Sequence, residues 1–396
     1  MIMSLLLQDV NLIDDRGERK ARQSVEIQQG RIHSILPNAQ PSKTAGLQTI
    51  DCKGHYLLPG LIDLHVHLVW DGSGDPADQL QRERREETLL RAVGHALQTL
   101  RAGITTVRDL GSVDDLAIDL ADAVERGHIL GPRIFASGQT IIMTGGHDSF
   151  WGIMVDGTDE VLKATRRQIS RGARVIKTSA TGGVYGRVQG EKALDEELSY
   201  EELRVLVEEA HRRGIPVAAH AIGQKGISNA VAAGVDTIEH GHQLTYLLAT
   251  ELATRNCALV PTLFVYRQIA EQPNIPEYAQ EKARAIIGAH RQAIQLARMA
   301  GLRIGAGTDA GSPLTPHGCL VDELLALVDA GLPSPDALKT ATYDAASILG
   351  MGSQLGRIEP GFIADLILVP ENPLEDLRRL RAVESVWKEG KLVFRS

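Results

Sequence analysis

One local pattern of apolar and polar residues recurs along the chain: an amphipathic helix, a glycine, and then a short apolar strand. Clear copies are ALQTLRAGITTVRDLG, VEEAHRRGIPVAAHA and ISNAVAAGVDTIEHG. The junction residues are Gly103, Gly172, Gly214, Gly234 and Gly301, with Asn256 in a sixth copy. Glycine and asparagine are the residues that most readily end a helix in the left-handed conformation. The pattern therefore predicts helices that alternate with buried strands.

Eight strands follow when GLIDLHVHL and GPRIFASG are added to these copies. The predicted ranges are 61–67, 103–109, 132–138, 173–178, 215–220, 235–240, 257–263 and 303–309. Eight parallel strands, each followed by a helix or loop, predict a (β/α)8 TIM barrel over residues 57–352. A doubly wound open sheet is the alternative, but no glycine-rich dinucleotide fingerprint follows the first strand.

The two ends of the chain differ from the middle. SVEIQQGRIHSIL near the N-terminus and ESVWKEGKLVFRS at the C-terminus each contain two strand-like runs around a turn glycine. Such runs are typical of β-hairpins. We therefore expect a small β-sandwich built from both chain ends, residues 1–56 and 353–396.

Composition narrows the class of protein. A chain of 396 residues with 43% hydrophobic and 23% charged residues is typical of a globular protein. A formal charge of −8 without a basic stripe argues against a nucleic-acid partner. The sequence has no apolar run of about 18 residues, which argues against a membrane span. The three scattered cysteines indicate no disulfide framework, so a reducing cytoplasm is the expected location.

Polar residues stand at the C-terminal ends of several predicted strands. His65 and His67 are two positions apart, so they point to the same side of their strand. The ends of four later strands carry Lys177, His220, His240 and Asp309. A single histidine or aspartate at such a place is ordinary in a rim or a turn. Lys177 is harder to explain, because burying an unpaired lysine is costly. Since active sites of barrels lie at this end, the six together predict a metal site.

This set of residues resembles the amidohydrolase superfamily over essentially the whole chain. The motifs are HVH, the lysine of VIKTS, the histidines of AAHA and IEHG, and the aspartate of GTDAG. TGGH (144–147), TGGV (181–184) and TPHG (315–318) are similar to the prolidase and imidazolonepropionase-like branch. The resemblance implies a metal-dependent hydrolase that acts on carbon–nitrogen bonds.

The resemblance also implies a cofactor set: two divalent ions and a CO2-derived carbamate on Lys177. One ion would be held by His65, His67, Lys177 and Asp309, and the other by Lys177, His220 and His240. These ligand types suit Zn2+ best, while Mn2+, Co2+ and Fe2+ stay open. Two such ions would lower the pKa of a bridging water and so make hydroxide available. Asp309 would take its proton and pass it to the leaving amine.

The leading prediction is hydrolysis of a dipeptide, Xaa-Pro or similar, or of an N-acyl amino acid. A cyclic amide hydrolase of the imidazolonepropionase type and a deaminase are alternatives, and a non-catalytic scaffold is the least favoured. Superfamily deaminases typically have one metal and no bridging lysine, so Lys177 counts against a deaminase. Members of the branch commonly assemble, so a homo-oligomer is expected.

Candidate substrate contacts lie in the loops. The family counterpart of His147 approaches the substrate carbonyl, which makes His147 a second candidate catalytic residue. Tyr185 and His317 follow strands four and eight and are expected near the mouth. Arg187 or Lys192 could pair with a substrate carboxylate, although a charged loop residue is usually only solvated. His242 has no assigned role, and His211 and His290 are expected on helix surfaces.

Overall fold

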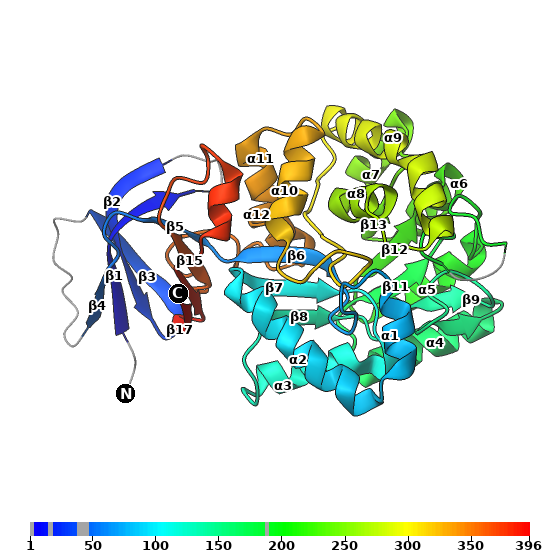
Figure 1. Ribbon diagram of the computed structural model, residues 1–396, viewed down its shortest axis with the longest axis horizontal. Helices are drawn as coiled ribbons and strands as arrows, with labels where there is room; N and C mark the ends of the chain where they lie inside the picture. The colour runs from blue at the N-terminus through cyan, green and yellow to red at the C-terminus, as the bar shows by residue number, and fades with distance from the viewer. Residues whose placement is uncertain (1–3, 15–18, 38–46, 187–189) are drawn as a thin grey trace.

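The computed structural model describes residues 4–14, 19–37, 47–186 and 190–396, which form two parts (Figure 1). Strands from both chain ends make one mixed sheet, and the residues between them make a barrel surrounded by helices. The predicted fold class, a TIM barrel with a small β-sandwich domain from both termini, is confirmed, and the strands of the terminal domain belong to one mixed sheet.

Seven regular parallel strands stand where the sequence predicts the first seven barrel strands. They are β6 (Leu61–Val66), β7 (Ile104–Asp109), β8 (Arg133–Ala136), β11 (Ile176–Ser179), β12 (Val217–Ala221), β13 (Thr237–His240) and β14 (Ala258–Val260). Between β8 and β11 the chain adds two short strands, β9 (Ile141–Met143) and β10 (Ile153–Val155). Strand β9 pairs with β11 on one side and with β10 on the other.

The eighth predicted strand, 303–309, is not a regular strand. This segment closes the barrel through isolated bridges of Ile304 to Leu259 and of Ala310 to Val66. Two glycines allow this segment to lie close to the neighbouring strands β6 and β14. A Cβ on Gly305, for example, would stand 2.3 Å from Leu64 Cδ1 in β6. A glycine-rich segment loses strand regularity because it has few side chains to pack on the pleat.

The helices surround the barrel and cover its carboxyl end. Those after the barrel strands are α2 (Arg85–Arg101), α3 (Leu116–Glu125), α4 (Thr158–Arg171), α5 (Tyr200–Arg212), α6 (Gln224–Ala233), α7 (Tyr246–Thr254) and α9 (Glu277–Met299). Helices α1 (Pro76–Arg82) and α8 (Leu263–Glu271) lie within the loops after β6 and β14. Helices α10 (Leu320–Asp329), α11 (Ser334–Thr340) and α12 (Tyr343–Ile348) complete the ring. Within the described ranges, no helix is long and apolar enough to cross a membrane.

The helix ends follow the predicted chemistry. All five junction glycines have φ between +65° and +101°, and Asn256 has φ +57°. These residues therefore end the helices in the left-handed conformation, in which other side chains are strained. Helix α5 begins with a capping box, in which Ser199 and Glu202 satisfy each other's backbone N–H groups.

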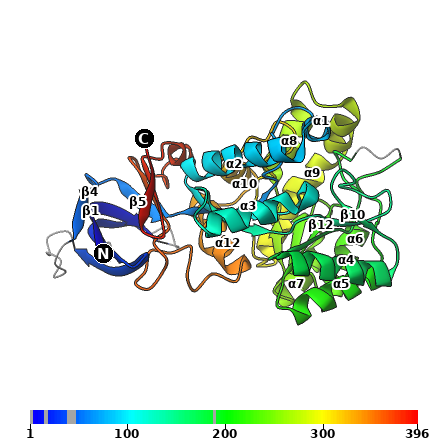
Figure 2. The same ribbon diagram turned by 90° about the horizontal axis from the view of Figure 1, so that it is seen from below.

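The terminal strands form one sheet in the order β17-β16-β15-β5-β1-β2-β3, with β4 on β1. Their bounds are β1 (Ser4–Ile13), β2 (Arg19–Gln28), β3 (Arg31–Pro37), β4 (Gln48–Asp51), β5 (Tyr56–Pro59), β15 (Leu366–Val369), β16 (Ser385–Lys388) and β17 (Lys391–Arg395). Figure 2 shows this sheet curling on itself. Its apolar side chains form a buried cluster that includes Leu7, Leu366 and Trp387. Strand β5 extends the sheet to Pro59, immediately before β6 enters the barrel.

Candidate metal centre

The six side chains predicted as metal ligands line one cavity at the carboxyl end of the barrel strands. They come from β6 and the residue after it, from β11, β12 and β13, and from the segment that closes the barrel: His65, His67, Lys177, His220, His240 and Asp309. Apart from Asp309, each of them is at most 4% exposed. The cavity therefore brings together nitrogen and oxygen donors from five separate places in the chain.

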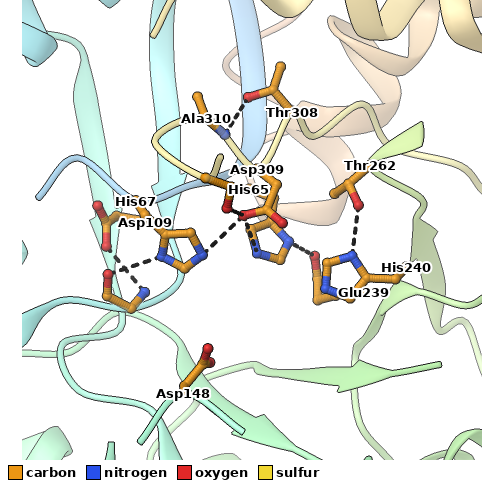
Figure 3. Close-up of polar contacts among 12 residues, drawn as sticks. His65, His67, Asp109, Asp148, Glu239, His240, Thr262, Thr308, Asp309 and Ala310 are labelled. Carbon is orange, nitrogen blue, oxygen red and sulfur yellow. Dashed lines mark hydrogen bonds and ion pairs between the residues drawn. The ribbon is translucent and has the colours of Figure 1, made fainter. Parts of the chain in front are cut away.

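Three of these donors already lie at the separation of ligands around one ion. One ligand atom from each of His65, His240 and Asp309 lies within 4.8 Å of the others. The Nε2 atoms of His65 and His67 stand 3.8 and 3.2 Å from Asp309 Oδ1. Figure 3 shows His65, His67 and Asp309 pointing toward one another. Farther along the cavity, the rings of His220 and His240 have centroids 4.6 Å apart.

Each of the four histidines has one ring nitrogen held by the protein. The contacts are His65 Nδ1 to Glu239 Oε2 at 2.8 Å, His67 Nδ1 to Gly111 O at 3.1 Å, His220 Nε2 to Gly182 O at 2.9 Å and His240 Nδ1 to Thr262 Oγ1 at 2.7 Å. The partners of His65, His67 and His220 are carboxylate or carbonyl oxygens, which accept, so the bound nitrogen of these three rings carries a proton; the Thr262 hydroxyl beside His240 can donate or accept. In the neutral rings of His65 and His220 the opposite nitrogen therefore keeps its lone pair, which is the form that binds a metal.

Glu239 is itself part of a buried ion pair. Its Oε1 accepts a hydrogen bond from Arg108 Nη2 at 2.7 Å, and the side chains of Glu239 and Arg108 are 0% and 4% exposed. Arg108 also donates to Leu64 O and Thr237 Oγ1. A chain of charged hydrogen bonds thus runs from β7 through β13 to the imidazole of His65.

Lys177 is the largest polar side chain in this centre, and it is 2% exposed. Within the described part of the chain, its amino group forms no hydrogen bond or ion pair. Burial lowers the pKa of Lys177, while the charges of Asp148 and Glu239 act in the opposite direction. A larger fraction of the Lys177 amine is therefore neutral here than it would be in water.

Burial decides the charge of three of the histidines; it would also lower the pKa of His67, but the carboxylate of Asp309 raises that pKa above its usual value. Burial lowers the pKa of His65, His220 and His240 well below the usual value, so these rings are neutral at pH 7. Burial alone would raise the pKa of Asp309, but His65 and His67 hold it below its usual range. Neutral imidazoles and an ionised carboxylate are the donor forms that a divalent ion requires.

Comparison with known proteins agrees with this donor set. Residues 56–393 match the model of the amidohydrolase family. The chain belongs to the amidohydrolase family. Among curated relatives, ochratoxinase from Aspergillus niger is 32% identical over 371 residues, covering 85% of this chain and 75% of the relative. Imidazolonepropionase from Methylobacterium nodulans is 27% identical over 378 residues, covering 89% and 88%.

Solved structures match even more of the chain. A Xaa-Pro dipeptidase with methionine bound in its active site superposes with a TM-score of 0.92 at 33% identity, covering 99% of this chain and all of the other. A prolidase complexed with N-methylphosphonate-L-proline gives a TM-score of 0.92 at 31% identity, with both chains fully covered. The protein is thus a hydrolase that acts on amide bonds of small molecules, in a family that uses divalent metals.

In this amidohydrolase, His147 enters the cavity from the loop after β9. Its ring lies 4.4 Å from that of His220, and its Nδ1 stands 3.0 Å from Glu191 Oε1. Its backbone N–H donates to Glu197 Oε1 at 2.7 Å. Burial would lower the pKa of His147, but Asp148 and Glu191 raise it to about 9. The structure therefore brings His147 to the metal ligands as a charged donor.

The other predicted substrate contacts fall in different places. Tyr185 lines the cavity. His317 does not line it, because its Nε2 hydrogen bonds Trp70 O at 2.8 Å while its ring stacks on His95. Lys192 is exposed and is not among the lining residues, and Arg187 lies outside the described residues. Among the described candidates, Tyr185 and His147 thus reach the cavity.

The prediction that His290 lies on the surface is wrong. His290 is 1% exposed and stacks on His242, with ring centroids 3.7 Å apart. Its position on α9 explains the burial, because Ile286 and Ile294, one turn away on each side, are buried too. His242 is equally buried and does not line the cavity. His211 is exposed, as predicted.

Sequence reasoning missed several cavity-lining residues, among them Trp70, Asp148 and Tyr266. Asp148 directly follows His147, so the GGHDS loop did carry a signal. Trp70 lies three residues after His67, whereas Tyr266 lies on α8 with no local signal of its role. Asp148, His240 and Asp309 also have left-handed backbone, with φ between +60° and +72°. Strained non-glycine residues of this kind cluster at functional sites.

Proposed function

We propose that this chain is a binuclear metal-dependent amidohydrolase that cleaves a dipeptide, Xaa-Pro or similar, or an N-acyl amino acid. The observation that carries the proposal is the single cavity shared by the six predicted ligands. Each of their histidines has one ring nitrogen held by a protein group outside the ligand set, which orients the ring. That arrangement is typical of preformed metal sites.

The donor set fits two ions with a shared anionic ligand. His65, His67 and Asp309 would hold one ion, His220 and His240 the other, and Lys177 both. For this, the Lys177 amine would add to CO2, forming a nitrogen–carbon bond and releasing one proton. The buried and unpartnered amine supports this carbamate, because the neutral form is the nucleophile. Imidazole and carboxylate donors favour Zn2+.

When bound, the ions would activate a water molecule and polarise the amide carbonyl. Asp309 would accept a proton from that water on a carboxylate oxygen and pass it to the leaving nitrogen. His147, with Nδ1 held by Glu191, would aim Nε2–H at the substrate carbonyl oxygen. A fixed donor of this kind stabilises the negative charge that develops on the oxygen.

The relatives support the substrate class. The Xaa-Pro dipeptidase and the prolidase complex contain methionine and a proline-based phosphonate, both of which carry an amino-acid carboxylate. The imidazolonepropionase relative keeps a cyclic amide as a second candidate. Lys177 argues against a deaminase, since superfamily deaminases typically work with one metal.

The test is a kinetic screen of zinc-loaded protein against Xaa-Pro, Xaa-Arg, Xaa-Lys and hydrophobic dipeptides, N-acyl amino acids and lactams. We expect two metals per chain and turnover of an open-chain amide that is lost after chelation. The matched variant Asp309→Asn should remain folded, keep most of the metal and lose turnover. One metal per chain, or full activity of this variant, would contradict the proposed mechanism.

Two further properties stay predictions. The cytoplasmic location is consistent with three buried, unpaired cysteines, Cys52, Cys257 and Cys319. A homo-oligomer is expected from the branch, and sedimentation of the purified protein would measure its state.

A further inference from the structure

Aromatic residues, which are 4% of the chain, gather beside the metal centre. The ring of Trp70 lies 4.3 Å from Trp151, 5.5 Å from Phe150 and 5.6 Å from Tyr185, measured between centroids. Trp70 and Tyr185 line the cavity, and Phe150 and Trp151 pack behind them. We call these four residues the aromatic wall.

One polar atom of the aromatic wall has no partner. Trp70 is only 3% exposed, and its indole Nε1 is buried. Within the described residues this nitrogen contacts no hydrogen-bond acceptor. The other polar atoms of the wall are used: Trp151 Nε1 donates to Thr140 Oγ1 at 3.1 Å, and the Tyr185 hydroxyl bonds Asp75. A buried N–H without an acceptor is costly, and Trp70 is one of the residues that line the cavity.

The backbone of Trp70 is fixed. Its N–H donates to His67 O at 3.0 Å, and its carbonyl accepts from His317 Nε2 at 2.8 Å. Gly311 packs so closely that a Cβ there would lie 2.9 Å from Trp70 Cβ. His317 was predicted to contact the substrate. Instead it holds the backbone of Trp70, which lines the cavity.

Part of the cavity lining beside the aromatic wall is apolar. Val184, Val265, Ile269 and Pro313 add apolar surface to the aromatic wall. Within the described lining, Lys177 is the one lysine or arginine, and it belongs to the metal centre. The Trp70 N–H is therefore a neutral donor, whereas the charged His147 lies beside the metal ligand His220.

We propose that the aromatic wall is the subsite for a large apolar, preferentially aromatic, side chain of the amide substrate, and that the Trp70 N–H donates to a substrate oxygen beside it. This rests on the proposed function, because it assumes that the cavity holds an amide substrate. Aromatic pairs gain more than their buried area alone provides, which favours phenylalanine over leucine and alanine at this subsite.

The test compares wild type with three variants at equal zinc content. Trp70→Phe keeps an aromatic ring and removes the N–H, whereas Trp70→Leu removes the ring too. Trp387→Phe is the matched control, because Trp387 is also a buried tryptophan with an unpartnered Nε1, but it lies in the terminal sheet. Substrates are glycyl-L-phenylalanine, glycyl-L-leucine, glycyl-L-alanine and the three N-acetyl amino acids.

In wild type, kcat/KM for the phenylalanine substrate should exceed that for alanine by roughly tenfold or more. Trp70→Phe should lower kcat/KM about fivefold for all substrates of the active series while keeping the preference, since it removes one hydrogen bond. Trp70→Leu should lose most of the preference, and Trp387→Phe should change neither quantity. Equal rates for phenylalanine and alanine, or an unchanged Trp70→Phe enzyme, would overturn the subsite while leaving the hydrolase intact.

A binding measurement separates this subsite from the proposed function. Calorimetric titration with L-phenylalanine and L-alanine needs no turnover, so it remains informative if none of the amides is hydrolysed. Tighter binding of L-phenylalanine that is lost in Trp70→Leu supports the aromatic subsite in either case. Equal binding of the two amino acids to wild type overturns it.

Discussion

Replacing Glu239 with glutamine should damage both the fold and the metal centre, because three donors converge on this carboxylate. Oε1 accepts from Arg108 Nη2 at 2.7 Å and from Thr237 Oγ1 at 2.5 Å, and Oε2 accepts from His65 Nδ1 at 2.8 Å. An amide of the same shape has one oxygen and one NH2 group. The NH2 must then face either Arg108, which can only donate, or His65.

The two orientations have different consequences, and both leave the Arg108 cation without a countercharge. Breaking a buried ion pair in this way costs about 3–5 kcal/mol of unfolding free energy. If the NH2 faces His65, the imidazole moves its proton to Nε2, and the nitrogen aimed at Asp309 can no longer bind a metal. Loss of such a supporting carboxylate lowers metal affinity by about 10- to 100-fold.

Urea unfolding of chelator-treated protein measures the loss of unfolding free energy. Competition with a zinc indicator measures the loss of metal affinity. Glu209→Gln is the matched control: its partners Arg166 and Arg212 are 55% and 64% exposed, so water can replace the lost interaction. Adding Arg108→Met to the Glu239 variant should restore part of the stability, since no unpaired cation remains. A stability within about 1 kcal/mol of wild type with unchanged zinc affinity would refute the reasoning.

Three further predictions concern other parts of the site. Lys177→Ala should retain fewer than two metals per chain and lose most activity, with partial rescue by short carboxylates; two tightly held metals in this variant would argue against a carbamate. Gly183→Ala should lower turnover without unfolding the protein, because its Cβ would stand 2.0 Å from the His147 ring; a crystal structure with His147 in place would disprove this. Burial raises the pKa of Glu197 to about 8, so the folded state binds more protons than the unfolded state above pH 4.5. This group should therefore make stability fall as pH rises toward 8, and Glu197→Gln should flatten that slope in pH-dependent unfolding.

The fold was largely predictable because its signals are local. The junction glycines mark helix ends through their own backbone preference, and all five have positive φ. Hairpin turns at Gln29–Gly30 and Glu389–Gly390 follow the same rule, with positive φ at both central residues. The segment 303–309 was misjudged because its glycines pack against Leu64 and Val260, residues far away in the sequence.

The candidate site was predictable only where a side chain stands on a strand end. His220 and Lys177 lie on neighbouring strands, so topology alone brings them to one edge. Tyr266 comes from α8 and His290 from α9, and their burial depends on how these helices pack over the barrel. Helix periodicity indicates which face is buried, but a polar residue such as His290 on that face hides the pattern.

The supporting groups explain how the site can stand ready without an ion. Glu239, Gly111, Gly182 and Thr262 hold the histidine rings through the nitrogen that does not face the cavity. Their hydrogen bonds are complete within the protein, so the rings need no metal to be oriented. The unfavourable free energy of burying polar groups arises instead on the cavity side. There the histidine ring nitrogens, the unpartnered amine of Lys177 and the buried carboxylate of Asp309 lie together. An ion that binds there relieves this cost in the folded state alone, so metal binding and folding must stabilise each other.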